Sequence, residues 1–284
     1  MVLTVLPKDD VLRAFGHSRL AWLAELGEQE TLAMGTALSS PAFGRVWDAN
    51  GIRDAALAQG MSPADAMAAA HAHLAQRGVV CFTWTMNPAV PAAATRPLVE
   101  HLLSLGYHEQ EELILRLSSA PPARPAAQGL MILPARAAFG PMREIAQQAV
   151  AHWNEPQLVE AAMARLDNPH WDVLLGLWDR RPVATTGLLT VGNLGLVEDV
   201  FVAPDFRGRG FGRALLSAAL EIAARAALSH VLLSVASDNA PAMNLYAGLG
   251  FVAAGVSRTY YRPECVLTPA NQTAAPRQAA AGGS

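Results

Sequence analysis

Residues 200–216 read VFVAPDFRGRGFGRALL, and this stretch decides how the rest of the chain is interpreted. An apolar strand ends at Pro204, a turn rich in arginine and glycine follows, and an amphipathic helix begins near Gly212. Glycines let a backbone turn tightly, and the start of a helix offers unpaired N–H groups and a positive dipole end. We therefore expect an anion site suited to a pyrophosphate or a 3′-phosphate, with cationic donors beside it: Arg207, Arg209 and Arg213.

Two familiar phosphate-binding patterns do not fit this turn. The dinucleotide fingerprint G-x-G-x-x-G would need its third glycine where Arg213 stands. A P-loop needs Lys and Ser or Thr after its last glycine, whereas Gly212 is followed by Arg213 and Ala214. The spacing that remains is R-x-x-G-x-G, at Arg207, Gly210 and Gly212.

This spacing resembles the acyl-CoA pyrophosphate loop of the GNAT superfamily of N-acetyltransferases. About 30 residues further on, Asn239 to Tyr246 is similar to the N-x-x-A-x-x-x-Y segment of the family, and LGF follows at 249–251. The resemblance covers roughly residues 129–262, about half of the chain. It implies an α/β (α+β) fold, with a mixed, mostly antiparallel sheet flanked by helices on both faces.

The resemblance also implies roles for individual residues. The thioester of acetyl-CoA would lie along the strand at Phe201 and Val202, where a main-chain N–H polarises its carbonyl. Tyr246 matches a tyrosine that protonates the departing thiolate, although a core aromatic would look the same. Asn239 would contact the cofactor arm, or simply cap a helix. The implied cofactor-binding residues are Phe201, Val202, Arg207, Gly208, Arg209, Gly210, Phe211, Gly212, Arg213 and Asn239.

Glu198 is the candidate general base. It lies four residues before Val202, so strand alternation predicts that it shares a face with Val200 and Val202, and that Asp199 points the other way. An acidic pair at this place in the resembled family binds the acceptor or deprotonates it through water. Partial burial of a carboxylate would raise its pKa toward a useful value. The alternative is a strand-edge charge in water.

Composition shifts divide the chain into segments. Residues 118–127, SSAPPARPAA, predict an interdomain linker, and residues 268–284 predict a disordered tail. Residues 128–267 have the order β-α-α-β-β-β-α-β-α-β and form the predicted catalytic domain.

The N-terminal segment, residues 1–117, ends in a similar way. Helices are expected over 63–77 and 97–105, and strands over 78–84 and 113–117, with LGY at 105–107 as a counterpart of LGF. We therefore expect two related domains from a diverged duplication. The first has no equivalent of the glycine-rich loop, so it is expected to be degenerate and to have lost cofactor binding.

Composition excludes several classes of protein. The 284 residues carry a net charge of −3, which argues against a nucleic-acid partner. Cys81 and Cys265 are far apart, and His71 and His73 at i and i+2 face different ways on a helix, so neither a disulfide scaffold nor a metal site is expected. No signal peptide and no apolar run long enough to cross a bilayer is present. A cytoplasmic protein with no membrane partner is expected.

The sequence thus predicts an acetyl-CoA-dependent N-acetyltransferase that transfers directly within a ternary complex, because no cysteine is positioned as a nucleophile. Its acceptor would be a small-molecule or peptide amine, and its oligomeric state a monomer or homodimer. Residues 152–155 and 47–50 could border the acceptor, or be ordinary loops. The alternative from another class is a non-catalytic acyl-CoA-binding or regulatory protein.

Overall fold

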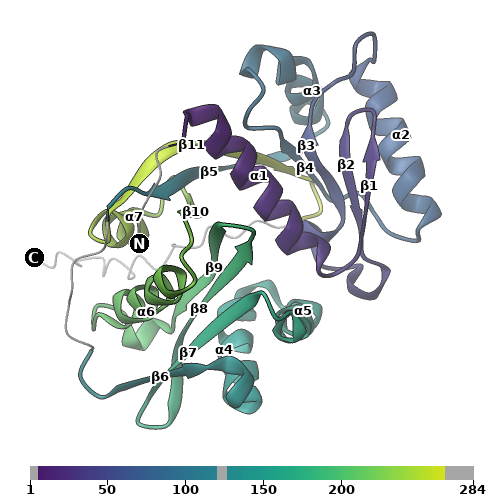
Figure 1. Ribbon diagram of the computed structural model, residues 1–284. Helices are drawn as coiled ribbons and strands as arrows, with labels where there is room; N and C mark the ends of the chain where they lie inside the picture. The colour runs from purple at the N-terminus through teal and green to yellow at the C-terminus, as the bar shows by residue number, and fades with distance from the viewer. Residues whose placement is uncertain (1–5, 120–126, 266–284) are drawn as a thin grey trace, which may run out of the picture.

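A computed structural model describes residues 6–119 and 127–265, and in these residues a single 11-stranded sheet runs through both halves of the chain (Figure 1). The strands are ordered β1-β2-β3-β4-β11-β5-β10-β9-β8-β7-β6. Only β3 with β4 and β9 with β10 pair in parallel. The strands are β1 (Glu28–Leu32), β2 (Gly35–Ser39), β3 (Gly51–Ala55), β4 (Thr83–Met86), β5 (His108–Leu117), β6 (Leu130–Pro134), β7 (Trp171–Trp178), β8 (Arg181–Val191), β9 (Leu194–Val202), β10 (His230–Ala236) and β11 (Phe251–Tyr261).

Helices cover both faces of the sheet. In the C-terminal half, each face of the sheet has its own apolar cluster. The cluster on one face contains Ile145, Leu175 and Leu189. The cluster on the other face contains Leu188, Leu216 and Leu220. α1 (Lys8–Ala24) lies across the middle of the sheet and contacts β8, β9, β11 and β5 (Figure 1). The others are α2 (Pro63–Gln76), α3 (Ala92–Ser104), α4 (Phe139–Val150), α5 (Pro156–Ala164), α6 (Phe211–Arg225) and α7 (Ala240–Ala247).

The two halves exchange strands at the centre of the sheet. β5, from the N-terminal half, lies between β10 and β11 and is antiparallel to both. β11, from the C-terminal half, lies between β5 and β4. β11 therefore pairs with no strand of its own half, and the sheet has no break at the chain's midpoint.

The halves also repeat a local backbone feature. β9 carries a bulge between the pairs Thr185–Phe201 and Gly187–Glu198, and Asp199 there has φ +54°. β3 carries a bulge between the pairs Ile52–Trp84 and Ala55–Met86, and Asp54 there has φ +51°. In both halves this strand is followed along the chain by a helix and then by its parallel partner. The repeat agrees with the expected relation between the domains.

The structure confirms the predicted mixed, mostly antiparallel sheet with helices on both faces. The predicted amphipathic helix is α6, whose buried apolar face includes Leu215, Leu216, Ala219, Leu220 and Ala223. Two local predictions were wrong. The strand expected over 78–84 begins only at Thr83, as β4, because the residues before it enter the core as a loop without a strand partner. The helix expected from Pro97 begins at Ala92, since alanines extend α3 without an apolar period.

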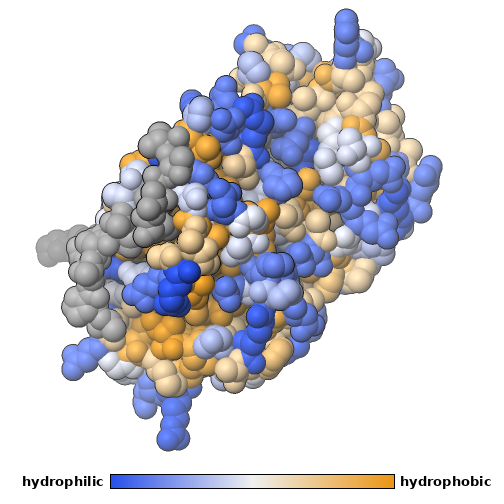
Figure 2. Space-filling view, in the orientation of Figure 1, coloured by the Kyte–Doolittle hydropathy of each residue, from blue (hydrophilic) through white to orange (hydrophobic). Residues whose placement is uncertain are grey.

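Parts of the prediction lie outside the described residues: most of the linker expected over 118–127, and the tail expected over 268–284. Within the described part, no helix is both long and apolar enough to cross a membrane. Figure 2 shows hydrophilic residues gathered over β1 and α2, and apolar residues mixed with charged ones over α6.

Candidate active site

A slot opens in the sheet where β9 and β10 separate. Their parallel pairing runs from Leu194 with His230 to Val197 with Leu233 and then stops. Both strands continue, β9 to Val202 and β10 to Ala236. The main-chain groups of β9 that face β10 beyond this point therefore have no strand partner across the slot.

The corresponding place in the N-terminal half is closed. β3 stays paired with β4 after its bulge, through Ala55 and Met86, which are the last residues of the two strands. The N–H of Asn87 extends this contact to the carbonyl of Ala55 at 3.1 Å. The described residues thus contain the parallel pair twice, but only β9 and β10 diverge.

The glycine-rich turn lies at the end of β9. A 3₁₀ turn at Pro204–Phe206 follows the strand, and α6 begins with Gly210 as its N-cap. Gly208 and Gly210 have φ values of +76° and +81°, and a Cβ on either would meet nothing within 4 Å. Left-handed backbone favours glycine here, and the space beside both residues is open. The start of α6 therefore presents its main-chain N–H groups to open space, at the place where the sequence predicts an anion site.

Gly212 is more closely packed: a Cβ there would lie 3.3 Å from the side chain of Val202 and 3.5 Å from that of Leu245. The three arginines surround the turn. Arg207 donates to the carbonyl of Val202 at 3.2 Å, and Arg213 to that of Gly248 at 2.9 Å. Arg209 lies over two aromatic rings, those of Trp178 and Phe206, and Phe211 is buried beneath the turn.

The bulge in β9 changes the expected direction of Glu198. Strand alternation placed Glu198 on the face of Val200 and Val202, and this was wrong. The bulge at Asp199 shifts the alternation by one residue, so Glu198 shares a face with Phe201. Phe201 packs in the cluster that contains α1 and α4, whereas Val202 packs with Phe211 of α6.

Glu198 therefore meets α1, and its partner there is Arg19. Arg19 Nη1 donates to Glu198 Oε1 at 2.5 Å, and the two side chains are 21% and 10% exposed. Burial raises the pKa of Glu198 to about 7, although the guanidinium of Arg19 lowers it. A carboxyl with this pKa is a suitable general base near neutral pH. The sequence did not identify Arg19, because nothing in its helix indicates a partner 179 residues away.

Tyr246 lies on the other side of the slot, on α7, and is 6% exposed. Its ring packs edge-on against Phe251 at 6.0 Å. Burial raises the pKa of Tyr246, and the charge of Glu198 raises it further. The phenol therefore stays protonated, as a proton donor must. Asn239 caps α7 by accepting from the N–H of Ala242 at 3.2 Å.

A cavity of about 220 Å³ lies between the two halves, on the α1 side of the sheet. Residues from both expected loops line it: Trp47 and Asp48 from one, Trp153 and Glu155 from the other. Arg19, which holds Glu198, is part of the same wall. The other lining residues, which sequence reasoning did not identify, are Arg45, Val46, Gln110, Glu112, Val150, Leu158 and Tyr261.

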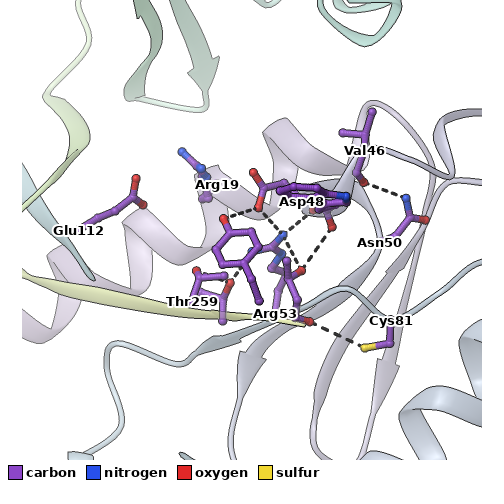
Figure 3. Close-up of polar contacts among 12 residues, drawn as sticks. Arg19, Val46, Asp48, Asn50, Arg53, Cys81, Glu112 and Thr259 are labelled. Carbon is purple, nitrogen blue, oxygen red and sulfur yellow. Dashed lines mark hydrogen bonds and ion pairs between the residues drawn. The ribbon is translucent and has the colours of Figure 1, made fainter. Parts of the chain in front are cut away.

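A polar network supports this cavity from the N-terminal half (Figure 3). Arg53 bonds to Thr85 and lies 3.3 Å from Asp48, which also accepts from the hydroxyl of Tyr261 at 3.0 Å. Burial acts to raise the pKa of Asp48, whereas the guanidinium of Arg53 lowers it, and the net shift is downward. Figure 3 shows Glu112 next to this network but joined by no interaction to the residues drawn.

Neither Cys81 nor Cys265 lines the cavity. Cys81 and Cys265 are buried, and burial raises the pKa of each to about 12, so neither is a thiolate near neutral pH. Among residues 6–119 and 127–265, no group of three or more His, Cys, Asp or Glu side chains is arranged to hold a metal ion.

Comparison with known proteins matches residues 140–251 to the Acetyltransferase (GNAT) family. Streptothricin acetyltransferase of Streptomyces lavendulae is 38% identical over 66 residues, which are 23% of this chain and 35% of that protein. Mycothiol acetyltransferase of Thermobifida fusca is 30% identical over 175 residues, 57% of this chain and 47% of that protein. The chain thus spans less than half of the length of these curated relatives.

Among solved structures, a GCN5-related N-acetyltransferase from Kribbella flavida has a TM-score of 0.64 at 16% identity, covering 89% of this chain and 95% of that one. A functionally unknown protein from Staphylococcus epidermidis has a TM-score of 0.58 at 10% identity, covering 84% and 94%. These similarities show that the fold extends over both halves of the chain.

Proposed function

We propose, from the premise that residues 140–251 form an acetyltransferase domain of the GNAT family, that this protein transfers an acetyl group from acetyl-CoA to a primary amine. The observation that carries the proposal is the slot between β9 and β10, with the open, glycine-rich N-terminus of α6 at its end. The N-terminal half contributes Arg19 and part of the acceptor cavity.

The residues present fit acetyl-CoA as acyl donor. The main-chain N–H groups at the start of α6 would bind its pyrophosphate, with Arg207, Arg209 and Arg213 adding positive charge. The unpaired edge of β9 at Phe201 and Val202 would hold the arm and polarise the carbonyl. When bound, acetyl-CoA supplies an activated thioester.

The reaction requires a neutral amine and a protonated leaving group. Glu198, with its raised pKa, takes a proton from the acceptor ammonium, directly or through water. The amine nitrogen then forms a bond to the carbonyl carbon as the C–S bond breaks. Tyr246 donates its proton to the departing sulfur. The nitrogen then loses its second proton through water, which returns one proton to Tyr246. The products are an amide and a free thiol, and the proton taken up by Glu198 is released to solvent. No covalent enzyme intermediate is needed, which agrees with the two buried, protonated cysteines.

The acceptor is proposed to be a small molecule. Two relatives are named streptothricin acetyltransferase and mycothiol acetyltransferase, and the cavity of about 220 Å³ is lined by residues of both halves. The competing proposal, a non-catalytic acyl-CoA-binding protein, keeps the loop but does not use Glu198 and Tyr246.

The test is release of CoA thiol from acetyl-CoA in the presence of a panel of primary amines. Gly210→Glu should abolish turnover, because a carboxylate at the start of α6 repels the pyrophosphate. Gly60→Glu is the matched control: Gly60 has φ +80° and equally open surroundings, far from the slot, so the same strain should leave the rate unchanged. Full activity of Gly210→Glu would overturn the proposal.

Tyr246→Phe separates an enzyme from a binding protein. It removes only the hydroxyl and should lower the rate on the order of 10²-fold if the phenol is the proton donor. An unchanged rate would remove Tyr246 from the mechanism. If the wild type binds acetyl-CoA but acetylates none of the amines, the non-catalytic alternative is supported instead.

A further inference from the structure

The size and lining of the cavity between the halves limit the kinds of acceptor molecule that it can bind. At about 220 Å³ it is smaller than the roughly 300–1,000 Å³ of sites for drug-sized ligands. Residues from α1, β5, α5 and β11 enclose it, together with those at the end of α4. This volume favours a small acceptor.

Three aromatic rings form one side of the cavity. Trp47 meets Trp153 at 5.4 Å and Tyr261 at 6.4 Å, both edge-on. Apolar side chains of Val46, Val150 and Leu158 complete this side. Such a wall favours a ligand with a flat, apolar body, which buries its faces against the rings. It offers few partners to a molecule rich in hydroxyl groups.

The charged residues of the cavity are paired, with one exception. Arg19 is bound to Glu198, Arg45 lies 3.4 Å from Glu155, and Asp48 lies 3.3 Å from Arg53. Glu112 has no ion-pair partner among the described residues and accepts one neutral hydrogen bond, from the hydroxyl of Ser234 at 3.2 Å. Its charge raises the pKa of Arg19, but the hydrogen bond of Arg19 goes to Glu198. Among the described carboxylates that line the cavity, Glu112 is thus the one without an ion-pair partner.

Glu112 is also placed beside the slot. It pairs with Ala236 across β5 and β10, and Ser234 is the first residue of β10 after its pairing with β9 stops. An ammonium held by Glu112 would therefore lie next to the slot, on the side where Arg19 presents Glu198. The exchanged strand of the N-terminal half carries this carboxylate into the site of the C-terminal half.

We propose that this cavity binds the acceptor as a small primary amine with a flat, apolar body, its ammonium received by Glu112 and its body by Trp47, Trp153 and Tyr261. The inference rests on the proposed acetyltransferase function. Glu112 is a binding residue here, and Glu198 still accepts the proton.

The test uses calorimetric titration of 2-phenylethylamine into the full-length protein with saturating CoA present. Glu112→Gln keeps the shape and the bond from Ser234 but removes the charge, so affinity for the amine should fall on the order of tenfold. Glu111→Gln is the matched control, because Glu111 is the adjacent residue on the opposite face and bonds to Arg258 at 2.8 Å. It should leave the affinity for the amine unchanged.

Two further measurements keep the inference separate from the proposed function. Trp153→Ala should weaken 2-phenylethylamine severalfold and leave acetyl-CoA binding unchanged, and ethanolamine, which has no apolar body, should bind the wild type more weakly. Equal affinities of Glu112→Gln and Glu111→Gln, or equal binding of the two amines, would overturn the inference even where acetyl-CoA is turned over. Loss of the proposed function would show instead as absence of acetyl-CoA binding and turnover, with the amine titrations unaffected.

Discussion

At the scale of the residue, the direction of Glu198 depends on one left-handed position in β9. Asp199, at φ +54°, shifts the alternation of β9, so Glu198 faces α1 and finds Arg19. Without the bulge, Glu198 would lie on the side of α6, away from the acceptor cavity. Its burial, rather than its residue type, gives it a pKa near neutrality.

The first prediction concerns the pH dependence of the rate. Because the pKa of Glu198 is raised to about 7, its basic form is lost as pH falls through 7, and acetylation should decline about tenfold per pH unit below that value. Glu198→Gln should be slower above pH 7 and lose this decline, so the ratio of wild-type to variant rates should rise with pH and level off. A ratio that is constant from pH 5.5 to 8.5 would exclude Glu198 as the base.

Arg19 is predicted to act through Glu198. Arg19→Met removes the cation that lowers the pKa of Glu198, so this pKa should rise and the decline in rate should move to higher pH. Arg19→Lys should restore much of the wild-type profile. The control is Arg13→Met on the same helix, where Arg13 pairs with exposed Asp10. A lower rate without a shifted profile would mean that Arg19 is only structural.

At the scale of the element, turns and helix faces could be predicted from neighbouring residues in the sequence. Strand neighbours and side-chain partners that are distant in the sequence could not. The turn at Arg207–Gly212 and the apolar face of α6 follow from spacing, and both are confirmed. The exchange of β5 and β11 could not be predicted, because alternation indicates a strand but not its neighbours. Glu112 and Arg19 were missed for the same reason, since each acquires its surroundings from a partner distant in sequence.

The strand exchange predicts that the halves do not fold separately. A fragment of residues 127–284 leaves β11 with no strand partner and β10 with one neighbour, β9. Circular dichroism and thermal melting should show no cooperative unfolding for this fragment. Co-expression with residues 1–119 should restore a folded complex that elutes as one species. A fragment that melts cooperatively and binds acetyl-CoA alone would contradict this reading of the sheet.

At the scale of the whole molecule, the two halves share a local strand arrangement and differ at the slot. Both keep the parallel strand pair with its bulge, but β9 and β10 diverge while β3 and β4 stay paired to their ends. The N-terminal half instead supplies α1, β5 and part of the lining of the proposed acceptor cavity. The molecule is therefore expected to bind one acetyl-CoA per chain, with an acceptor site made by both halves.

Calorimetric titration of acetyl-CoA into the full-length protein tests this central claim most directly. We expect one molecule bound per chain and loss of binding in Gly210→Glu. Binding should be unchanged in Gly60→Glu, because Gly60 has a similar φ of +80° but lies in the other half. Two molecules bound per chain, or wild-type affinity in Gly210→Glu, would contradict it.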